Sequence, residues 1–233
     1  MESRRVTRKA PRKSNARAQE KAEIAARTGE MLALAETMVA AAIRELTEGV
    51  PPARDVAAQD RELGALQRSI RRRIVAHLHE HPESDVLDCV TYLTLIVFVE
   101  RLGDYAKNLH EIHAALPRPF AELSRATAVT SLSRGILEMF RLTRVALTAE
   151  GDAEARRAIA LHGDLAAEAR AILDDLLHVP GTDPREAVAT ALAVRYLKRT
   201  SSHLMNVAST VITAFDEIGY HPDKRDDVPP IDD

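Results

Sequence analysis

Glu100 and Asp104 are the residues whose types and spacing could do chemistry. They are four residues apart within the run from Phe98 to Leu109, and this spacing places two side chains on the same face of an α-helix, one turn apart. Two carboxylates placed in this way could hold one cation between adjacent turns. A solvated acidic face is the simpler interpretation, because helices of soluble proteins carry many such pairs.

A long apolar helical pattern surrounds this pair and would position it. At about 100° per residue, apolar residues recur along one side of the helix, and the two acids lie nearly opposite that side. One face would therefore pack in a core, while half-buried carboxylates on the other face need a partner such as arginine or a metal. The apolar residues of the packing side are Leu95, Val99, Leu102, Ala106, Leu109 and Ile112.

The composition predicts an all-α protein. The 233 residues suffice for a sizeable core, Trp is absent and 3% of residues are aromatic, which is typical of helical bundles rather than of β-sandwiches. The one cysteine, Cys89, has no partner for a disulfide and no spacing of a zinc site, so we interpret it as a small buried side chain. The longest uncharged run, Cys89 to Val99, is about half of what a bilayer span needs, and we expect a cytoplasmic protein.

Charge is unevenly distributed along the chain. Residues 1–21 hold eight basic residues against Glu2 and Glu20, a net charge of +6, whereas the whole chain has −3 and the remainder therefore −9. We expect a disordered basic arm over residues 1–20. Residues 1–21 either solubilise the chain or bind nucleic acid, an anionic lipid, polyphosphate or the acidic body itself. Residues 220–233 are predicted to form an unstructured acidic tail.

Six helical segments follow from the apolar pattern and its interruptions. Prolines and glycines separate them, because proline removes a backbone donor and glycine commonly ends a helix. The predicted segments are about Lys21–Glu48, Ala53–His81, Ser84–Leu116, Ala121–Thr148, Ala153–His178 and Pro184–Ile218.

A fixed spacing of 98 residues relates the first three segments to the last three, which indicates an internal repeat. The upstream acids Asp164 and Glu168 likewise correspond to Asp60 and Gly64, with a spacing to the last segment that is about six residues shorter. The pairs at the 98-residue spacing are Pro82 and Pro180, Phe98 and Tyr196, Arg101 and Arg199, and Asn108 and Asn206.

The two repeats resemble the PhoU family of regulators of phosphate uptake. The run Glu100-Arg101-Leu102-Gly103-Asp104-Tyr105-Ala106-Lys107-Asn108-Leu109 resembles the family motif Glu-Arg-Ile-Gly-Asp-His/Tyr-Ala-x-Asn-Ile. The run from Arg195 to Val207 resembles the motif of the second family repeat, and Asp60 to Leu66 resembles the upstream Asp-x-x-Ile-Asp-x-Leu, with Gly64 in place of the second acid. The resemblance covers residues 25–218.

The resemblance implies two tandem, pseudo-symmetric three-helix bundles. We predict a first repeat over residues 21–117 and a second over residues 121–219, between the basic arm of residues 1–20 and the acidic tail of residues 220–233.

The same resemblance implies that paired carboxylates can hold metal. The first repeat keeps Asp60, Glu100 and Asp104, whereas Lys198 and Ser202 replace the last two in the second repeat, where an ammonium group would repel a cation. Asp164 and Glu168 are weaker candidates. Oxygen ligands suit a divalent ion, Mg²⁺ or Mn²⁺, with iron or Zn²⁺ as further candidates. In the alternative interpretation, the acids pair with Arg101, Arg199 or Lys198.

The histidines form no metal site that the sequence spacing supports. His77, His79 and His81 gather at a predicted helix end, and His110 and His113 lie three residues apart, but neither group has the Glu-x-x-His spacing of di-iron bundles. The negative end of a helix dipole favours such histidines.

By this resemblance, the chain is expected to be a non-enzymatic regulator of phosphate transport and phosphate-starvation signalling that acts by protein binding. Its partners would be the ATPase of an ABC phosphate importer and a phosphate-sensing histidine kinase, and we expect a homodimer. Two alternatives stay open, which are an accessory partner of a sodium-phosphate cotransporter and an adaptor that binds nucleic acid or an anionic membrane through the basic arm. A metal-storage or di-iron bundle fits least well.

Overall fold

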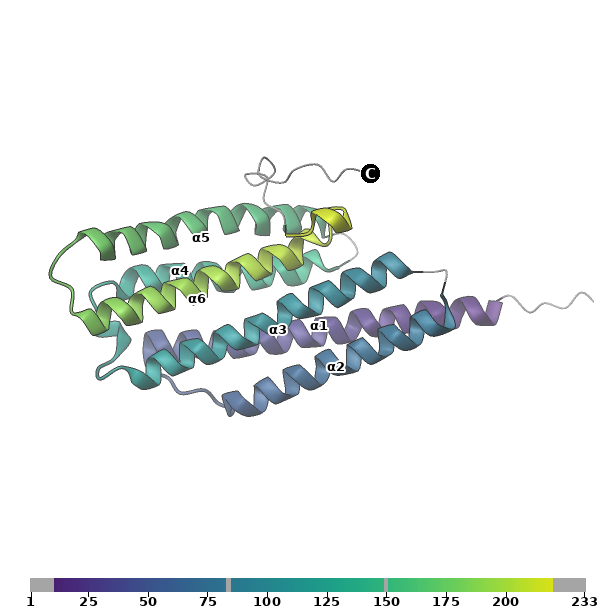
Figure 1. The fold of residues 1–233 in the computed structure, drawn as a ribbon, viewed down its shortest axis with the longest axis horizontal. Helices are drawn as coiled ribbons and strands as arrows, with labels where there is room; N and C mark the ends of the chain where they lie inside the picture. Colours follow the sequence, from purple (N-terminus) through teal and green to yellow (C-terminus); the bar gives the residue numbers. More distant parts are fainter. Residues whose placement is uncertain (1–10, 83–84, 149–150, 220–233) are drawn as a thin grey trace, which may run out of the picture.

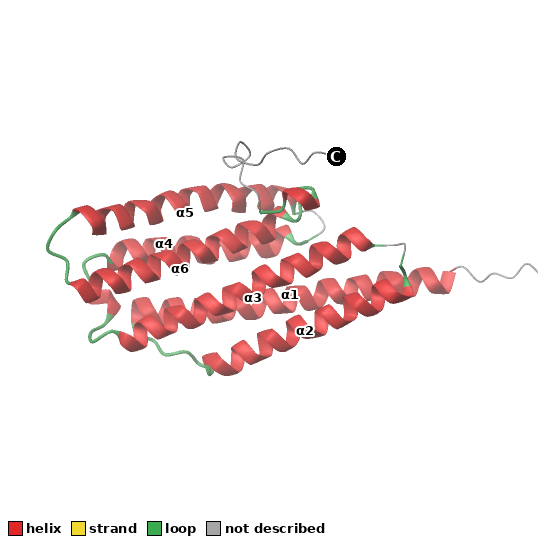
Figure 2. Cartoon of the chain, viewed as in Figure 1, coloured by secondary structure: helices red, strands yellow, loops and turns green. Residues whose placement is uncertain are grey.

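The structure, a computed structural model, describes residues 11–82, 85–148 and 151–219, and over these residues the chain is helical without strands (Figures 1 and 2). The all-α prediction is therefore confirmed. The helices of this part are α1 (Pro11–Glu48), α2 (Val56–Glu80), α3 (Val86–Ala115), α4 (Ala126–Ala146), α5 (Asp152–His178) and α6 (Pro184–Ser209), with short 3-10 helices η1 (Phe120–Glu122) and η2 (Phe215–Glu217).

The helices form two three-helix bundles that lie side by side. Helices α1, α2 and α3 pack against one another, and so do α4, α5 and α6; α3 packs on α6 and α1 on α4 to join the bundles. The helices α2 and α5 lie on the outer sides (Figure 1). One continuous set of buried apolar side chains runs through both bundles, so the two repeats share a core.

Local sequence explains where several helices begin. The carboxylate of Asp55 accepts backbone hydrogen bonds from Ala57 and Ala58 at 3.1 and 3.2 Å and so caps α2. Asp183 caps α6 in the same way, with Arg185 N at 2.9 Å, and Pro184 occupies the first turn of α6, where its missing N–H is not needed. These caps satisfy backbone donors that the first helical turn leaves without partners.

The first helix is longer than the sequence predicts. We expected it to start near Lys21, whereas α1 starts at Pro11. Arg17 of the predicted arm and Lys21, the first residue after it, explain the difference. Arg17 donates to Asp85 at 2.7 Å, and Lys21 donates to Asp85 at 3.0 Å and to Asp88 at 2.6 Å. These ion pairs tie the segment to the start of α3. Residues 1–10 and 220–233, which include the rest of the arm and the tail, lie outside the described residues.

Two other helix ends differ from the prediction. Helix α4 starts at Ala126 rather than near Ala121, because the backbone N–H and the hydroxyl of Ser124 both donate to the carboxylate of Glu186 on α6. Helix α6 ends at Ser209 rather than near Ile218. There the hydroxyls of Ser209 and Thr210 donate to carbonyl oxygens three residues earlier, which competes with helix continuation.

In each bundle, a leucine of an outer helix sits directly on a glycine of its neighbour. A Cβ on Gly103 of α3 would lie 2.4 Å from Leu63 of α2, and a Cβ on Gly135 of α4 would lie 2.3 Å from Leu165 of α5. Both leucines are buried. The two glycines thus permit close helix approach in the two halves. None of the described helices is long and apolar enough to cross a membrane.

Candidate functional site

The predicted acids of the first repeat lie on one face that α2 and α3 share. The apolar side of α3 predicted from the sequence is buried throughout, and this orients Glu100 and Asp104 away from the core, with 32% and 28% of their side chains exposed. Asp60 projects from α2 beside them, because the Lys107 ammonium group lies 3.0 Å from the carboxylates of both Asp60 and Asp104. The structure therefore brings Asp60 and Asp104 together around a lysine.

Ion pairs hold this face. Arg101 donates to Asp104 at 3.0 Å and lies 3.7 Å from the Glu100 carboxylate. Burial alone would lower the pKa of Lys107, but its hydrogen bonds to Asp104 and Asp60 outweigh burial and leave that pKa raised. This arrangement fits the alternative interpretation for Arg101, one of the three cations it named, whereas the second cation is Lys107 rather than Arg199 or Lys198. A metal ion would have to displace the Lys107 ammonium group, so metal binding by Asp60, Glu100 and Asp104 stays a prediction.

Glu100 differs from the other two acids because its ion pair is longer. Arg101 lies 3.7 Å from the Glu100 carboxylate, whereas a cation lies 3.0 Å from Asp60 and from Asp104. Burial raises its pKa, and the neighbouring Asp104 carboxylate raises it further, which outweighs the opposing effect of Arg101. A carboxyl group with a raised pKa at the edge of a charged face can accept or donate a hydrogen bond to a bound partner.

The corresponding face of the second repeat has a different character. On α6, Lys198 and Ser202 take the positions of Glu100 and Asp104. The Ser202 hydroxyl donates a hydrogen bond within its own helix, to the Lys198 carbonyl at 3.0 Å. Asp164 is exposed on α5 and Glu168 is half-buried. This half therefore offers two acids on one helix and a lysine on the other, and the structure leaves the weaker metal prediction untested.

Helices α3 and α6 meet at a polar cluster that the sequence repeat could have revealed. Tyr105 and His203 are 98 residues apart in the chain, and the Tyr105 hydroxyl lies 3.1 Å from His203 Nε2. Arg199 donates to the same hydroxyl at 2.8 Å. Equivalent residues of two repeats touch where a pseudo-twofold axis passes, so this cluster marks the junction of the bundles. The motifs alone did not predict it, because each motif describes the residues of a single helix.

The His203 imidazole is held in its neutral form at this junction. Burial lowers its pKa to about 4, and the nearby positive charges of Arg199 and Arg101 add to the effect. Its ring lies 5.6 Å from that of Tyr105 and 5.7 Å from that of Phe98.

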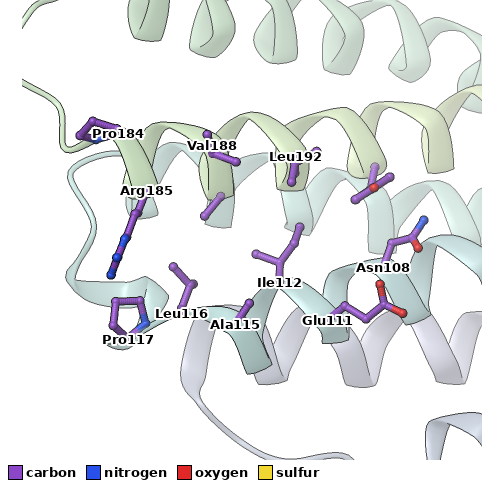
Figure 3. Close-up of a pocket in the computed structure, with 12 residues that line it drawn as sticks. Asn108, Glu111, Ile112, Ala115, Leu116, Pro117, Pro184, Arg185, Val188 and Leu192 are labelled. Carbon is purple, nitrogen blue, oxygen red and sulfur yellow. The ribbon is translucent and has the colours of Figure 1, made fainter.

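An apolar groove of about 580 Å³ opens where the end of α3 runs beside the start of α6 (Figure 3). Ile112 and Leu116 form one wall, and Val188 and Leu192 of α6 form the other. Asn108, the asparagine of the first motif, lies at one end, and Arg185 lies near Pro117 at the other end (Figure 3). Val188 is 59% exposed, so the groove offers apolar surface to solvent.

A further group of possible metal ligands lies at the opposite end of the first bundle. His77 and His81, which we had explained by the helix dipole, meet Glu20 of α1, and one ligand atom of each lies within 4.8 Å of the others. Sequence spacing could not reveal this group, because Glu20 is 57 residues before His77.

Comparisons with known proteins agree with the resemblance to the PhoU family that the two motifs indicate. Residues 28–112 match the family model of the PhoU domain. The fold is similar to the crystal structure of PhoU from Pseudomonas aeruginosa, with a TM-score of 0.74, 21% identity, and coverage of 84% of this chain and 96% of that chain. It is also similar to the phosphate transport system regulatory protein PhoU from Streptococcus pneumoniae, with a TM-score of 0.65, 14% identity, and coverage of 85% and 92%. No curated protein matches the sequence.

Proposed function

Since this chain carries a PhoU domain over residues 28–112, we propose that it regulates phosphate transport and phosphate-starvation signalling by binding other proteins. The domain match is the observation that carries the proposal. It spans Asp60, Glu100 and Asp104, so the charged face of α2 and α3 belongs to the part of the chain that the family model describes. The likeness to solved PhoU structures over most of the chain supports the same fold for both repeats.

The charged face of α2 and α3 suits a binding role. Its acids and bases already hold one another through Lys107 and Arg101, so their side chains lose little conformational freedom when a partner binds. The Arg101 side chain is 54% exposed and can pair with a carboxylate of the partner. Such charges contribute mainly to association rate and to the choice of partner.

By family analogy, the partners would be the ATPase of an ABC phosphate importer and a phosphate-sensing histidine kinase. A pull-down from phosphate-replete cells with the tagged chain, read by mass spectrometry, tests this assignment. Wild-type chain is expected to recover one or both proteins, and Glu100→Ala/Asp104→Ala is expected to recover less of them. Asp164→Ala/Glu168→Ala is the matched control, because it removes two acids from the second repeat.

Other outcomes of this pull-down would contradict the assignment. Recovery of a sodium-phosphate cotransporter instead would favour the accessory-partner alternative. Recovery of nucleic acid or anionic lipid alone, independent of the acidic residues, would overturn the regulator proposal and favour an adaptor that uses the basic arm.

We also propose a homodimer, since the bundles leave apolar side chains such as Leu177 and Val188 exposed and most soluble oligomers pair identical chains symmetrically. Light scattering checks this directly. A mass near twice the 25.6 kDa of the chain is expected, and a mass equal to one chain over a wide range of concentrations would contradict the dimer.

A further inference from the structure

The first turns of α1 lie beside the end of α2 (Figure 1). There Glu20, His77 and His81 form a group of ligating side chains, at the opposite end of α2 from Asp60. The Glu20 Oε2 atom lies 2.7 Å from His77 Nδ1 and 3.5 Å from His81 Nε2. We propose that these three residues bind a Zn²⁺ ion.

The separations of the ligand atoms are close to those that zinc requires. Zinc bonds to nitrogen and oxygen of about 2.0–2.2 Å in a tetrahedron place neighbouring ligand atoms roughly 3.3 Å apart. The distance from Glu20 to His81 already fits, and the distance from Glu20 to His77 needs to open by about half an ångström. A carboxylate at the end of a flexible side chain can make this adjustment, since 34% of the Glu20 side chain is exposed.

The arrangement around His77 is the one that a metal-binding histidine needs. Its Nδ1 atom hydrogen-bonds to Glu20 and its Nε2 atom lies 3.2 Å from the Asp85 carboxylate. When a metal ion replaces the proton on Nδ1, Asp85 can therefore keep the Nε2–H and leave the Nδ1 lone pair to the metal. Metal-binding histidines almost always donate their second ring N–H to such an acceptor, which fixes the tautomer and raises the basicity of the ligand atom. The His77 side chain is 1% exposed, so its orientation is firmly set.

Asp85 is itself held in place for this contact. It has a left-handed backbone conformation, with φ of 60°, and its side chain does not cap α3. Instead it accepts hydrogen bonds from Arg17 and Lys21. The two cations are thus paired with Asp85 and leave the Glu20 carboxylate to the histidines.

Space and charge beside the group also permit an ion. A pocket of about 180 Å³ borders Glu20 and His77, which leaves room for a water molecule as fourth ligand. Arg73 also lines this pocket, but its guanidinium pairs with Glu23, so its charge is offset. Two imidazoles and one carboxylate favour zinc over Mg²⁺, which prefers oxygen ligands alone.

Zinc binding to the full chain tests the proposal. After removal of metal with a chelator, Zn²⁺ is titrated at neutral pH in competition with a chromophoric chelator, and Co²⁺ is substituted to read the coordination from its visible spectrum. Wild-type chain is expected to bind one Zn²⁺ tightly and to give the Co²⁺ spectrum of a four-coordinate site with nitrogen ligands. Asp85→Asn should weaken binding by about 10–100-fold, and Glu20→Gln and His81→Gln should weaken it at least as much.

His79→Gln is the matched control, because His79 lies between the two proposed ligands in sequence but is exposed on the other side of α2. It should leave zinc affinity unchanged. Circular dichroism confirms that each variant keeps its helices, and the partly exposed Glu20 and His81 can be replaced without opening the core. The proposal is overturned if wild type binds no Zn²⁺, if Glu20→Gln and His81→Gln bind it as wild type does, or if His79→Gln weakens it equally.

Discussion

Two aspartates precede the two motif helices, and they make different contacts. Asp183 stands before α6 and accepts backbone N–H groups of the first turn, as a helix cap does. Asp85 is 98 residues earlier and stands before α3, but its left-handed conformation directs the carboxylate to Arg17, Lys21 and His77. The second repeat uses this position to start a helix, and the first repeat uses it to tie α1 to α3.

The outward faces of the same two helices differ as well. Glu100 and Asp104 of α3 stand in an ion-pair network with Arg101 and Lys107, whereas α6 has Lys198 and Ser202 at these positions. The inward faces are alike, since both helices bury an apolar side in one common core. The two repeats therefore share their packing positions and differ at their polar surface positions.

The largest expected effect is on the packing that the repeats share. Leu63→Ala and Leu165→Ala each remove a buried leucine that rests on a glycine, and each should lower the free energy of unfolding by about 2–5 kcal/mol. Urea denaturation followed by circular dichroism measures this. Leu177→Ala, at a position 79% exposed, should change it by less than about 0.5 kcal/mol. A large loss in only one of the two bundles would contradict equivalent packing.

The next effect separates the two aspartates. Asp183→Ala removes a helix cap and should cost about 1 kcal/mol. Asp85→Ala should lower the melting temperature further, because Arg17, Lys21 and His77 all lose a partner. Thermal melts with a chelator present compare the two without any contribution from metal. Equal melting temperatures for the two variants would show that the contacts of Asp85 with α1 add nothing beyond a cap.

A smaller effect concerns the junction, where Tyr105 of one repeat faces His203 of the other. The pKa of His203 is about 4 in the folded chain, compared with an ordinary value of 6.5. Between pH 4 and pH 6.5 the unfolded chain therefore binds more protons than the folded chain. The free energy of unfolding should fall as the pH decreases from about 6.5 toward 4. For this partly exposed ring, the loss should be on the order of 1 kcal/mol after solvent screening is allowed for.

His203→Gln should remove that pH dependence, and urea denaturation at pH 7 and pH 5 measures it. The hydrogen bond from Ser124 lowers the pKa of Glu186 from its ordinary value of 4.5. Glu186 therefore loses its contribution to stability only below about pH 4.5, and it does not affect the comparison between pH 7 and pH 5. His178→Gln, at an exposed helix end, is the control. An unchanged pH profile in His203→Gln would mean that the neutral imidazole does not stabilise the junction.

The smallest effect on stability is expected when the outward face of α3 is converted to that of α6. Glu100→Lys/Asp104→Ser removes ion pairs that are partly exposed, and such pairs contribute little, so the free energy of unfolding should change by about 0.5 kcal/mol or less. Lys107 keeps Asp60 as a partner. A loss of several kcal/mol by urea denaturation would show that this face serves folding rather than partner binding.

The fold could be predicted from the sequence because it depends on repeated local patterns. The apolar pattern with its proline and glycine interruptions predicted six helices, and the 98-residue spacing indicated a repeat. The arrangement in two three-helix bundles was implied by the resemblance to the PhoU family. Contacts between distant helices could not be predicted in this way. The insertion of Lys107 between Asp60 and Asp104, and the meeting of Glu20 with His77, depend on how helices are rotated against one another and on side-chain conformations, which no spacing within one helix determines.

The uptake of labelled phosphate by phosphate-replete cells tests the central claim, phosphate regulation, most directly. Cells that lack this gene should take up and store more phosphate than the parent strain, and a copy of the wild-type gene should restore the lower rate, whereas a copy with Glu100→Lys/Asp104→Ser should not. A deletion strain whose phosphate uptake and phosphate content equal those of its parent would contradict the account.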